Sequence, residues 1–190
     1  MEKPEKLKRD FMEEDFHDSL KWLFTGAITW HAHPLDKDHA YLRSLGMFTS
    51  LVHARALYEF FYKCGQSSHP NAGATASAKD FVASWNSPAD RKQLYSRYMA
   101  KQKPAQRRVF HLVYGRGKPA GGSMGGGSAE LNEQVLEFAR DLRRLTEEFI
   151  RSLSENPDYD AFRQLAESAL SKALAVGSAL AAGYNIPMPL

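Results

Sequence analysis

One stretch of this 190-residue chain concentrates the residues that could do chemistry. Residues 91–118, the basic stretch, contain nine cations and no Asp or Glu. The nine cations are Arg91, Lys92, Arg97, Lys101, Lys103, Arg107, Arg108, Arg116 and Lys118. The rings interleaved with them are Tyr95, Tyr98, Phe110, His111 and Tyr114. Cations neutralise phosphates and planar rings stack on unpaired bases, so the stretch predicts contact with RNA or another phosphate polymer. The alternative is a solvated basic face whose rings point into the core.

The overall charge hides this segregation. The 25 cations and 22 anions of the chain give a formal net charge of only +3. The other 162 residues hold 16 cations against 22 anions, a balance of −6, so the rest of the molecule is mildly acidic. The pattern therefore indicates that polyanion binding is confined to one segment, residues 91–118, and that the protein as a whole is not basic.

His111 is the titratable group that could add catalysis to binding. On a helix, Arg107, His111 and Tyr114 would share one face, at positions i, i+4 and i+7. A guanidinium suits phosphate oxygens and an imidazole titrates near neutral pH, so the trio could hold a phosphate and move a proton. A histidine among apolar residues is more often a hydrogen-bonded core group. The β-prone run 108–114 also leaves helix and strand both open.

A second polar group lies in an otherwise apolar helical segment. Arg55 and Glu59 are four residues apart and can pair, while His53 faces a different direction. One interpretation is a structural ion pair that joins neighbouring helices. The other is a site that Arg55 forms together with His111.

Metal and cofactor chemistry have little support in the sequence. His31, His33 and His39 flank a proline with a spacing that matches no zinc template, and a surface turn is the better interpretation. The single Cys64 excludes a disulfide framework and a cysteine-rich zinc site. No phosphate-binding loop or dinucleotide fingerprint occurs, so no cofactor is expected.

The elements that must position these residues are predicted to be helices. Apolar residues recur at three-, four- and five-residue steps from Pro4 to about Trp30, and a second helix begins at Asp36 or Asp38 and runs to Lys63. Further helices are expected over residues 77–82, 87–99, 129–155 and 159–182. The sum is one all-α domain, an antiparallel helical bundle of about five or six helices.

The C-terminal third is predicted to be a helical hairpin over residues 129–183, followed by a tail over 184–190. A glycine-rich loop at 115–128 precedes it and is compatible with a natural loop or an engineered linker. Heptad steps of 4, 3, 4, 3 and 4 join Leu131, Val135, Phe138, Leu142, Leu145 and Phe149. This heptad seam requires a partner helix, which could belong to the same chain or to a second copy.

Targeting signals are not expected. Mixed charges continue from Met1 to Asp18, which disfavours a secretory signal. Residues 173–190 lack charge, but their glycines and prolines disfavour a stable membrane span. These features predict a cytoplasmic protein without membrane contact.

Two stretches of the chain resemble a group of small, uncharacterised bacterial helical proteins. They are residues 51–61 and 106–116, and Asp80 and Phe81 lie between them where that group has an Asp-Phe pair. The resemblance covers residues 42–116. That group is loosely similar to the HEPN superfamily of helical bundles. Many HEPN proteins are metal-independent ribonucleases or nucleic-acid binders in toxin and defence systems.

The HEPN resemblance implies a homodimer or another helical protein partner and, if the chain is an enzyme, a metal-independent ribonuclease. His111 would act as general base on a ribose 2′-OH. Arg107, Arg55 or Arg116 would stabilise the charge that develops on phosphorus. The HEPN signature has four to six residues between its Arg and its His, whereas three residues separate Arg107 from His111 and two separate Arg108 from His111. The alternative function is a non-catalytic interaction module that self-associates through the heptad seam.

Cleavage of single-stranded RNA tests the catalytic assignment. If HEPN-like chemistry operates, the full chain cleaves RNA in the presence of EDTA. His111→Ala then slows cleavage by roughly a hundredfold or more, because the general base is lost, and leaves RNA binding intact. Denaturing gels of the RNA over time measure the rate. Cleavage that survives the substitution contradicts the assignment.

Overall fold

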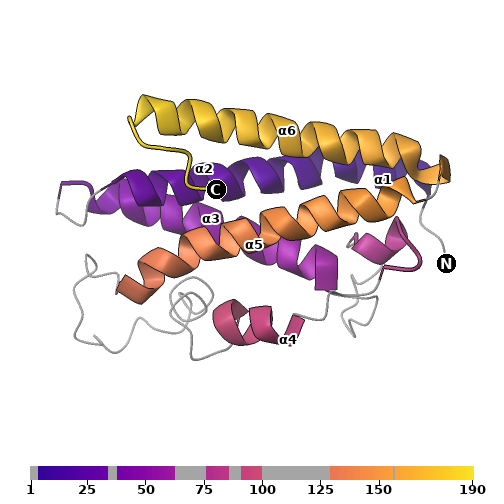
Figure 1. The fold of residues 1–190 in the computed structure, drawn as a ribbon, viewed down its shortest axis with the longest axis horizontal. Coiled ribbons are helices and arrows are strands. Elements are labelled where there is room, and N and C mark those ends of the chain that lie inside the picture. Colours follow the sequence, from indigo (N-terminus) through magenta and orange to yellow (C-terminus); the bar gives the residue numbers. More distant parts are fainter. Residues whose placement is uncertain (1–3, 34–37, 63–75, 86–90, 100–128, 156) are drawn as a thin grey trace.

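The computed structural model describes residues 4–33, 38–62, 76–85, 91–99, 129–155 and 157–190. Within these ranges the chain forms helices and no strand, which confirms the all-α fold class. The long helices α2, α3, α5 and α6 lie alongside one another, and the short α4 lies below α5 in the view of Figure 1.

The first helical segment contains a π-helical turn. Its parts are α1 (Glu5–Phe11), the π turn (Met12–Phe16) and α2 (His17–Ala32). Phe11 and Phe16 are five residues apart, and a π turn brings positions i and i+5 together where an α turn does not. Both ring centroids lie 5.3 Å from that of Phe60. The amphipathic helix predicted here is therefore present, and its π turn contains one residue more than an α-helical turn does.

Helix α3 (Ala40–Tyr62) meets α2 backbone to backbone. A Cβ atom added to Gly26 would lie 2.5 Å from the amide nitrogen of Ser50 and 2.6 Å from the carbonyl oxygen of Gly46. One added to Gly46 would lie 2.8 Å from the carbonyl oxygen of Gly26. No side chain fits at such distances, so the crossing of the two helices requires glycine on both sides.

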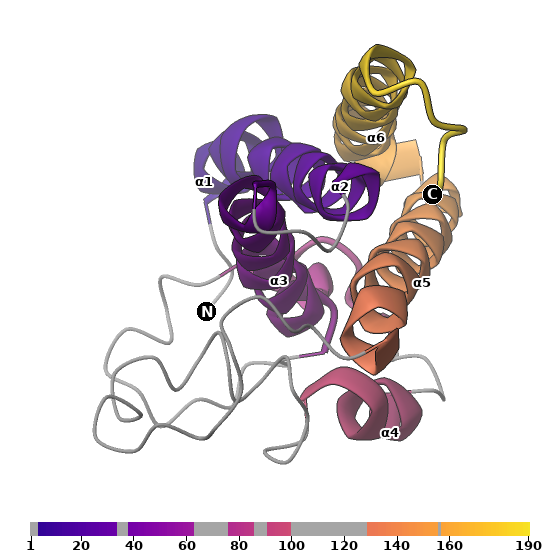
Figure 2. The ribbon, with the colours of Figure 1, turned by 90° about the vertical axis from the view of Figure 1, so that its left-hand side faces the viewer.

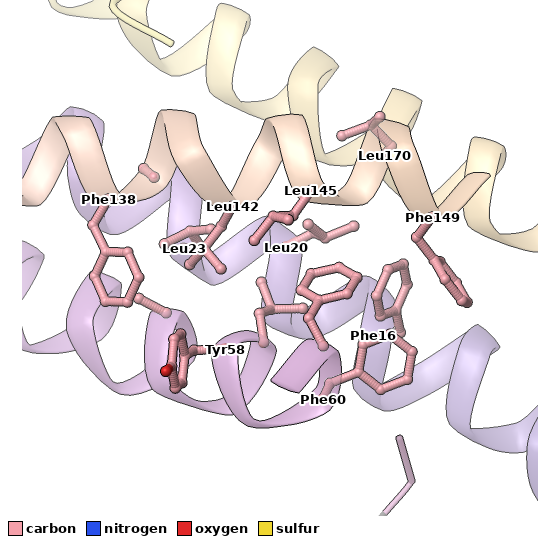
Figure 3. Close-up of a cluster of buried hydrophobic side chains, with 14 of the residues drawn as sticks. Phe16, Leu20, Leu23, Tyr58, Phe60, Phe138, Leu142, Leu145, Phe149 and Leu170 are labelled. Carbon is pink, nitrogen blue, oxygen red and sulfur yellow. The ribbon is translucent and has the colours of Figure 1, made fainter. Parts of the chain in front are cut away.

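Helix α5 (Ala129–Ser154) buries the heptad seam within the single chain. Its described members Val135, Phe138, Leu142, Leu145 and Phe149 are at most 2% exposed. Figure 3 shows Leu142 and Leu145 next to Leu20 and Leu23 of α2. The seam therefore closes inside one chain, and this part of it is not available for self-association.

Helix α6 (Asp160–Gly183) follows a 3₁₀ turn (Pro157–Tyr159) and packs on α2. Its contact face consists of small residues, as the sequence predicts: Ala169, Ala173, Gly177 and Ala181 are buried. The tail 184–190 then returns to α5. Arg140 Nε donates to the carbonyl oxygen of Pro189 at 2.8 Å, and Arg143 Nη1 donates to that of Leu190 at 3.0 Å.

Helix direction departs from simple alternation. Helices α2 and α3 run in opposite directions, as do α5 and α6, whereas the neighbours α2 and α6 run the same way (Figures 1 and 2). The bundle is thus two helical hairpins packed together, and not an up-and-down antiparallel bundle in which every neighbour alternates.

Aromatic rings fill the end of the bundle where α2 begins. Phe149 of α5 lies 5.3 Å from Phe60 and 6.1 Å from Phe16, measured between ring centroids (Figure 3). The segment 76–85 closes this end: Trp85 Nε1 donates to the carbonyl oxygen of Phe61 at 2.9 Å. The sequence predicts a helix over residues 77–82, and the structure has a 3₁₀ helix (Ala78–Asp80) whose N-terminus is closed by a capping box of Ser77 and Asp80.

Replacing Gly26 with alanine tests the backbone contact between α2 and α3. The new methyl group meets backbone atoms that cannot move aside, so we expect the free energy of unfolding to fall by about 2–4 kcal/mol. The control is Gly183→Ala, where an added Cβ meets nothing within 4 Å. Gly183→Ala should change the free energy of unfolding by no more than about 1 kcal/mol. Urea unfolding followed by circular dichroism measures both, and equal effects would contradict the close contact.

Candidate functional site

The described beginning of the basic stretch is fastened to α5 by Tyr98. Helix α4 (Arg91–Leu94) continues into a π turn (Tyr95–Met99), and both lie beside α5 in Figure 2. The Tyr98 ring stacks on that of Phe138, with centroids 4.3 Å apart and planes within 10°. Its hydroxyl donates to Asp141 Oδ2 at 2.9 Å. A single side chain thus supplies both a packing contact and a directional bond.

This placement corrects one expected role of Tyr98. The ring is 1% exposed, so it is a core group and presents no face on which a base could stack. Burial raises the pKa of the Tyr98 hydroxyl, and the neighbouring Asp141 carboxylate acts in the same direction. The phenol therefore stays protonated at neutral pH and keeps donating to Asp141.

Arg97 is the one cation of the basic stretch whose side chain lies among the described residues. Its side chain is 43% exposed, and Nη1 lies 3.5 Å from Asp141 Oδ2. A hydrogen bond with Tyr98 is the main cause that raises the pKa of Arg97, and Asp141 adds to it. Arg144 approaches the same carboxylate at 3.7 Å. A phosphate that bound Arg97 would thus compete with Asp141, so this cation contributes less than its charge suggests.

The other predicted binding residues divide into two groups. Arg91, Lys92 and Tyr95 have their backbones in α4 and the following π turn. The second group lies outside the described residues: Lys101, Lys103, Arg107, Arg108, His111, Arg116 and Lys118. The glycine-rich loop at 115–128 and the choice between helix and strand at 108–114 lie there too. Their roles stay predictions.

Arg55 forms the ion pair that the sequence predicts. Its Nε lies 3.0 Å from Glu59 Oε1, one turn along α3, and the side chain is 41% exposed. His53 is half-buried, and burial lowers its pKa, while Asp18 acts in the opposite direction. The pair is therefore present within α3, whereas a role in joining neighbouring helices and the convergence of Arg55 with His111 remain predictions.

Arg43 of α3 bonds to the end of α2, beside His33 and His39. Arg43 is only 7% exposed, and its Nη1 donates to the carbonyl oxygen of Trp30 at 2.8 Å and to that of His33. The rings of His33 and His39 stack at 5.3 Å, and Tyr184 meets His33 edge-on at 5.1 Å. In the described part of the chain no three His, Cys, Asp or Glu side chains gather as a metal site would require.

Sequence reasoning missed Arg43. Its guanidinium lies 3.7 Å from the centre of the Trp30 ring, and burial lowers its pKa. The sequence does contain a signal for it, because Arg43 is the only Lys, Arg, Asp or Glu between Asp38 and Arg55. A lone charge on a helix that is otherwise apolar indicates a buried group with specific partners.

One described segment, Pro157–Gly183, is long and apolar enough to cross a membrane by length and composition. Of the apolar window in this segment 33% is buried, and α6 packs its small residues against α2.

No protein-family model, curated protein or solved structure matches this chain. The resemblance of residues 42–116 to uncharacterised bacterial helical proteins, and through them to HEPN proteins, therefore remains a prediction.

Replacing Tyr98 with phenylalanine tests the anchor of the basic stretch. The ring stays and the bond to Asp141 is lost, so we expect the free energy of unfolding to fall by about 1–2 kcal/mol at neutral pH. Folding raises the pKa of Tyr98. The contribution of its hydroxyl to the free energy of unfolding is therefore intact below tyrosine's ordinary pKa of about 10, and it is lost as the pH rises above that value. The difference between wild type and variant should therefore shrink at alkaline pH.

The matched control is Tyr41→Phe, which removes a hydroxyl from a residue that is 76% exposed. It should change stability by less than about 0.5 kcal/mol at both pH values. Urea unfolding near neutral and at alkaline pH gives the comparison. A difference for Tyr98→Phe that grows with pH would contradict the assigned pKa direction.

Proposed function

We propose that this chain binds single-stranded RNA, or a similar phosphate polymer, through residues 91–118. The observation that carries the proposal is the segregation of charge: nine cations without a carboxylate in 28 residues, in a molecule that is otherwise acidic. Such a one-signed segment attracts a polyanion and releases its counterions, while the acidic remainder repels it. Binding is therefore directed to one segment.

The anchoring of Tyr98 supports this proposal. Because Tyr98 is held by Phe138 and Asp141, the first residues of the basic stretch are attached to a rigid helix of the bundle. A ligand bound there would be held by the folded domain. Arg97 is partly neutralised by Asp141, so the proposal assigns most of the phosphate contact to the cations that follow it in sequence.

Salt dependence of RNA binding tests the proposal. We expect fluorescence anisotropy of a labelled single-stranded oligonucleotide to show binding at low salt that weakens steeply toward moderate salt. In the quadruple variant Lys101→Gln, Lys103→Gln, Arg107→Gln, Arg108→Gln, the slope of log K against log salt should become shallower by roughly 3, because each lost phosphate contact on a single strand accounts for about 0.7.

The matched control removes four cations from other surfaces: Arg9→Gln, Lys21→Gln, Arg163→Gln and Lys172→Gln. These residues belong to α1, α2 and α6. The control changes net charge equally and should keep the affinity within about threefold. No retention of RNA at low salt, or equal losses in both quadruple variants, would overturn the proposal. Equal competition by inorganic polyphosphate would indicate that charge alone is recognised.

A further inference from the structure

The tail 184–190 leaves α6 through a Schellman motif. Asn185 has a positive φ of 55°, and the amide of Ile186 donates to the carbonyl oxygen of Ala181 at 3.0 Å. This motif reverses the chain, and Figures 1 and 2 show the tail returning across the bundle toward α5. The beginning of the tail is therefore fixed by backbone bonds to α6, and its last residues contact other helices.

The last residues of the tail lie on four residues from three helices, which we call the tail seat: Ile28, Arg140, Arg143 and Gly177. Arg140 and Arg143 of α5 donate to the carbonyl oxygens of Pro189 and Leu190. Arg143 also donates through Nε to Glu147 at 2.9 Å, which fixes the guanidinium with Nη1 directed at the tail. The seat thus offers hydrogen-bond donors to an incoming backbone.

The seat also offers an apolar contact. A Cβ atom added to Gly177 would lie 3.0 Å from Met188 Cε and 3.0 Å from Ile28 Cδ1. Met188 therefore packs on α6 at a buried residue that has no side chain of its own. Leu190 is partly buried and packs against the core.

The sequence of the tail suits this seat. Prolines alternate with apolar residues from Ile186 to Leu190, and no residue of this segment is charged. A proline has a carbonyl acceptor and no N–H donor, so the segment matches a surface that supplies donors through arginines. Prolines also hold the residues before them in an extended conformation, which lowers the entropy lost on binding. Proline-containing peptides are recognised in this way by many binding domains.

The tail is held loosely compared with the helices. None of the residues 184–190 is buried, and the bond from Arg140 to Pro189 is exposed to solvent. Segments with few buried contacts at the end of a chain open locally without unfolding the domain. The tail can therefore leave its seat while the four long helices stay packed.

We propose that the tail is an internal ligand, and that its seat binds an extended, uncharged peptide of another protein in which prolines alternate with apolar residues. The tail itself shows the chemistry that fits: a Met-sized side chain against Gly177 and two carbonyl oxygens toward Arg140 and Arg143. Tail and partner compete for one seat, so the tail limits access to it. This proposal does not depend on RNA binding.

Fluorescence anisotropy of a labelled peptide with the sequence of residues 184–190 tests the competition. The tail variant Met188→Lys with Leu190→Lys places ammonium groups beside the guanidinium groups of the seat, which displaces the tail and leaves the seat unchanged. We expect the full-length tail variant to bind the peptide, and the wild type to bind it about tenfold or more weakly, because its own tail occupies the seat. A peptide with the same two lysines is the control and should not bind.

Substitutions in the seat test where the peptide binds. Arg140→Met with Arg143→Met keeps the apolar stems and removes both donors, so it should weaken binding to the tail variant by about tenfold or more. The matched control is Arg9→Met with Arg151→Met, which changes net charge equally on α1 and at the last turn of α5. It should leave the dissociation constant within about twofold. Circular dichroism verifies that each variant is folded.

Three results would overturn the proposal. Equal affinity of the wild type and the tail variant would mean that the tail does not occlude the seat. A tail variant without saturable binding at high micromolar peptide has no such seat. Binding that survives Arg140→Met with Arg143→Met lies on another surface. If the tail variant does not fold, titration of the wild type to high peptide concentration decides, since its binding should saturate and be lost in the same arginine variant.

Discussion

The contact between α2 and α3 at Gly26 and Gly46 is the constraint on which the bundle depends. Two helices with ordinary side chains between them keep their axes about 8–10 Å apart. Here the backbones themselves touch, and a single methyl group would push the helices apart. This contact fixes α2 at the centre, where it also meets α5 and α6. At α6 the same principle recurs, because Gly177 approaches the side chain of Ile28.

The close crossing also decides which face of α3 is turned away from α2. Small residues, Gly46 and Ser50, take the contact with α2, while Leu51, Leu57 and Phe61 point into the core. The remaining side of the helix carries large apolar residues at helical spacing. Because the smallest residues of α3 lie at its closest contact, its larger apolar side chains lie on the opposite side, where several of them are exposed.

Periodicity was sufficient to predict most helices, because burial on one face leaves a regular trace in the sequence. The five-residue step from Phe11 to Phe16 was present in the same pattern, but a π turn differs from an α turn by one residue and cannot be distinguished without the rings of α3. The heptad seam of α5 shows a different limit. A seam specifies a complementary surface and does not specify which chain supplies it, and only the fold shows that α2 and its neighbours do.

Polar anchors were harder to predict than apolar faces, since each depends on two segments that are distant in sequence. Arg43 of α3 holds the end of α2 through the backbone carbonyls of Trp30 and His33, and since every residue has a carbonyl, the sequence does not indicate which ones accept. The sequence allows two roles for Tyr98, a ring buried in the core and a ring that stacks on a base. The composition of the basic stretch does not distinguish these two roles. The structure shows that the ring is buried: Asp141, 43 residues away, accepts a hydrogen bond from the Tyr98 hydroxyl, and Phe138 covers the ring. The described part of the basic stretch is therefore held to the bundle by the hydrogen bond and the ring packing of Tyr98, and the charge pattern of the stretch predicts neither contact.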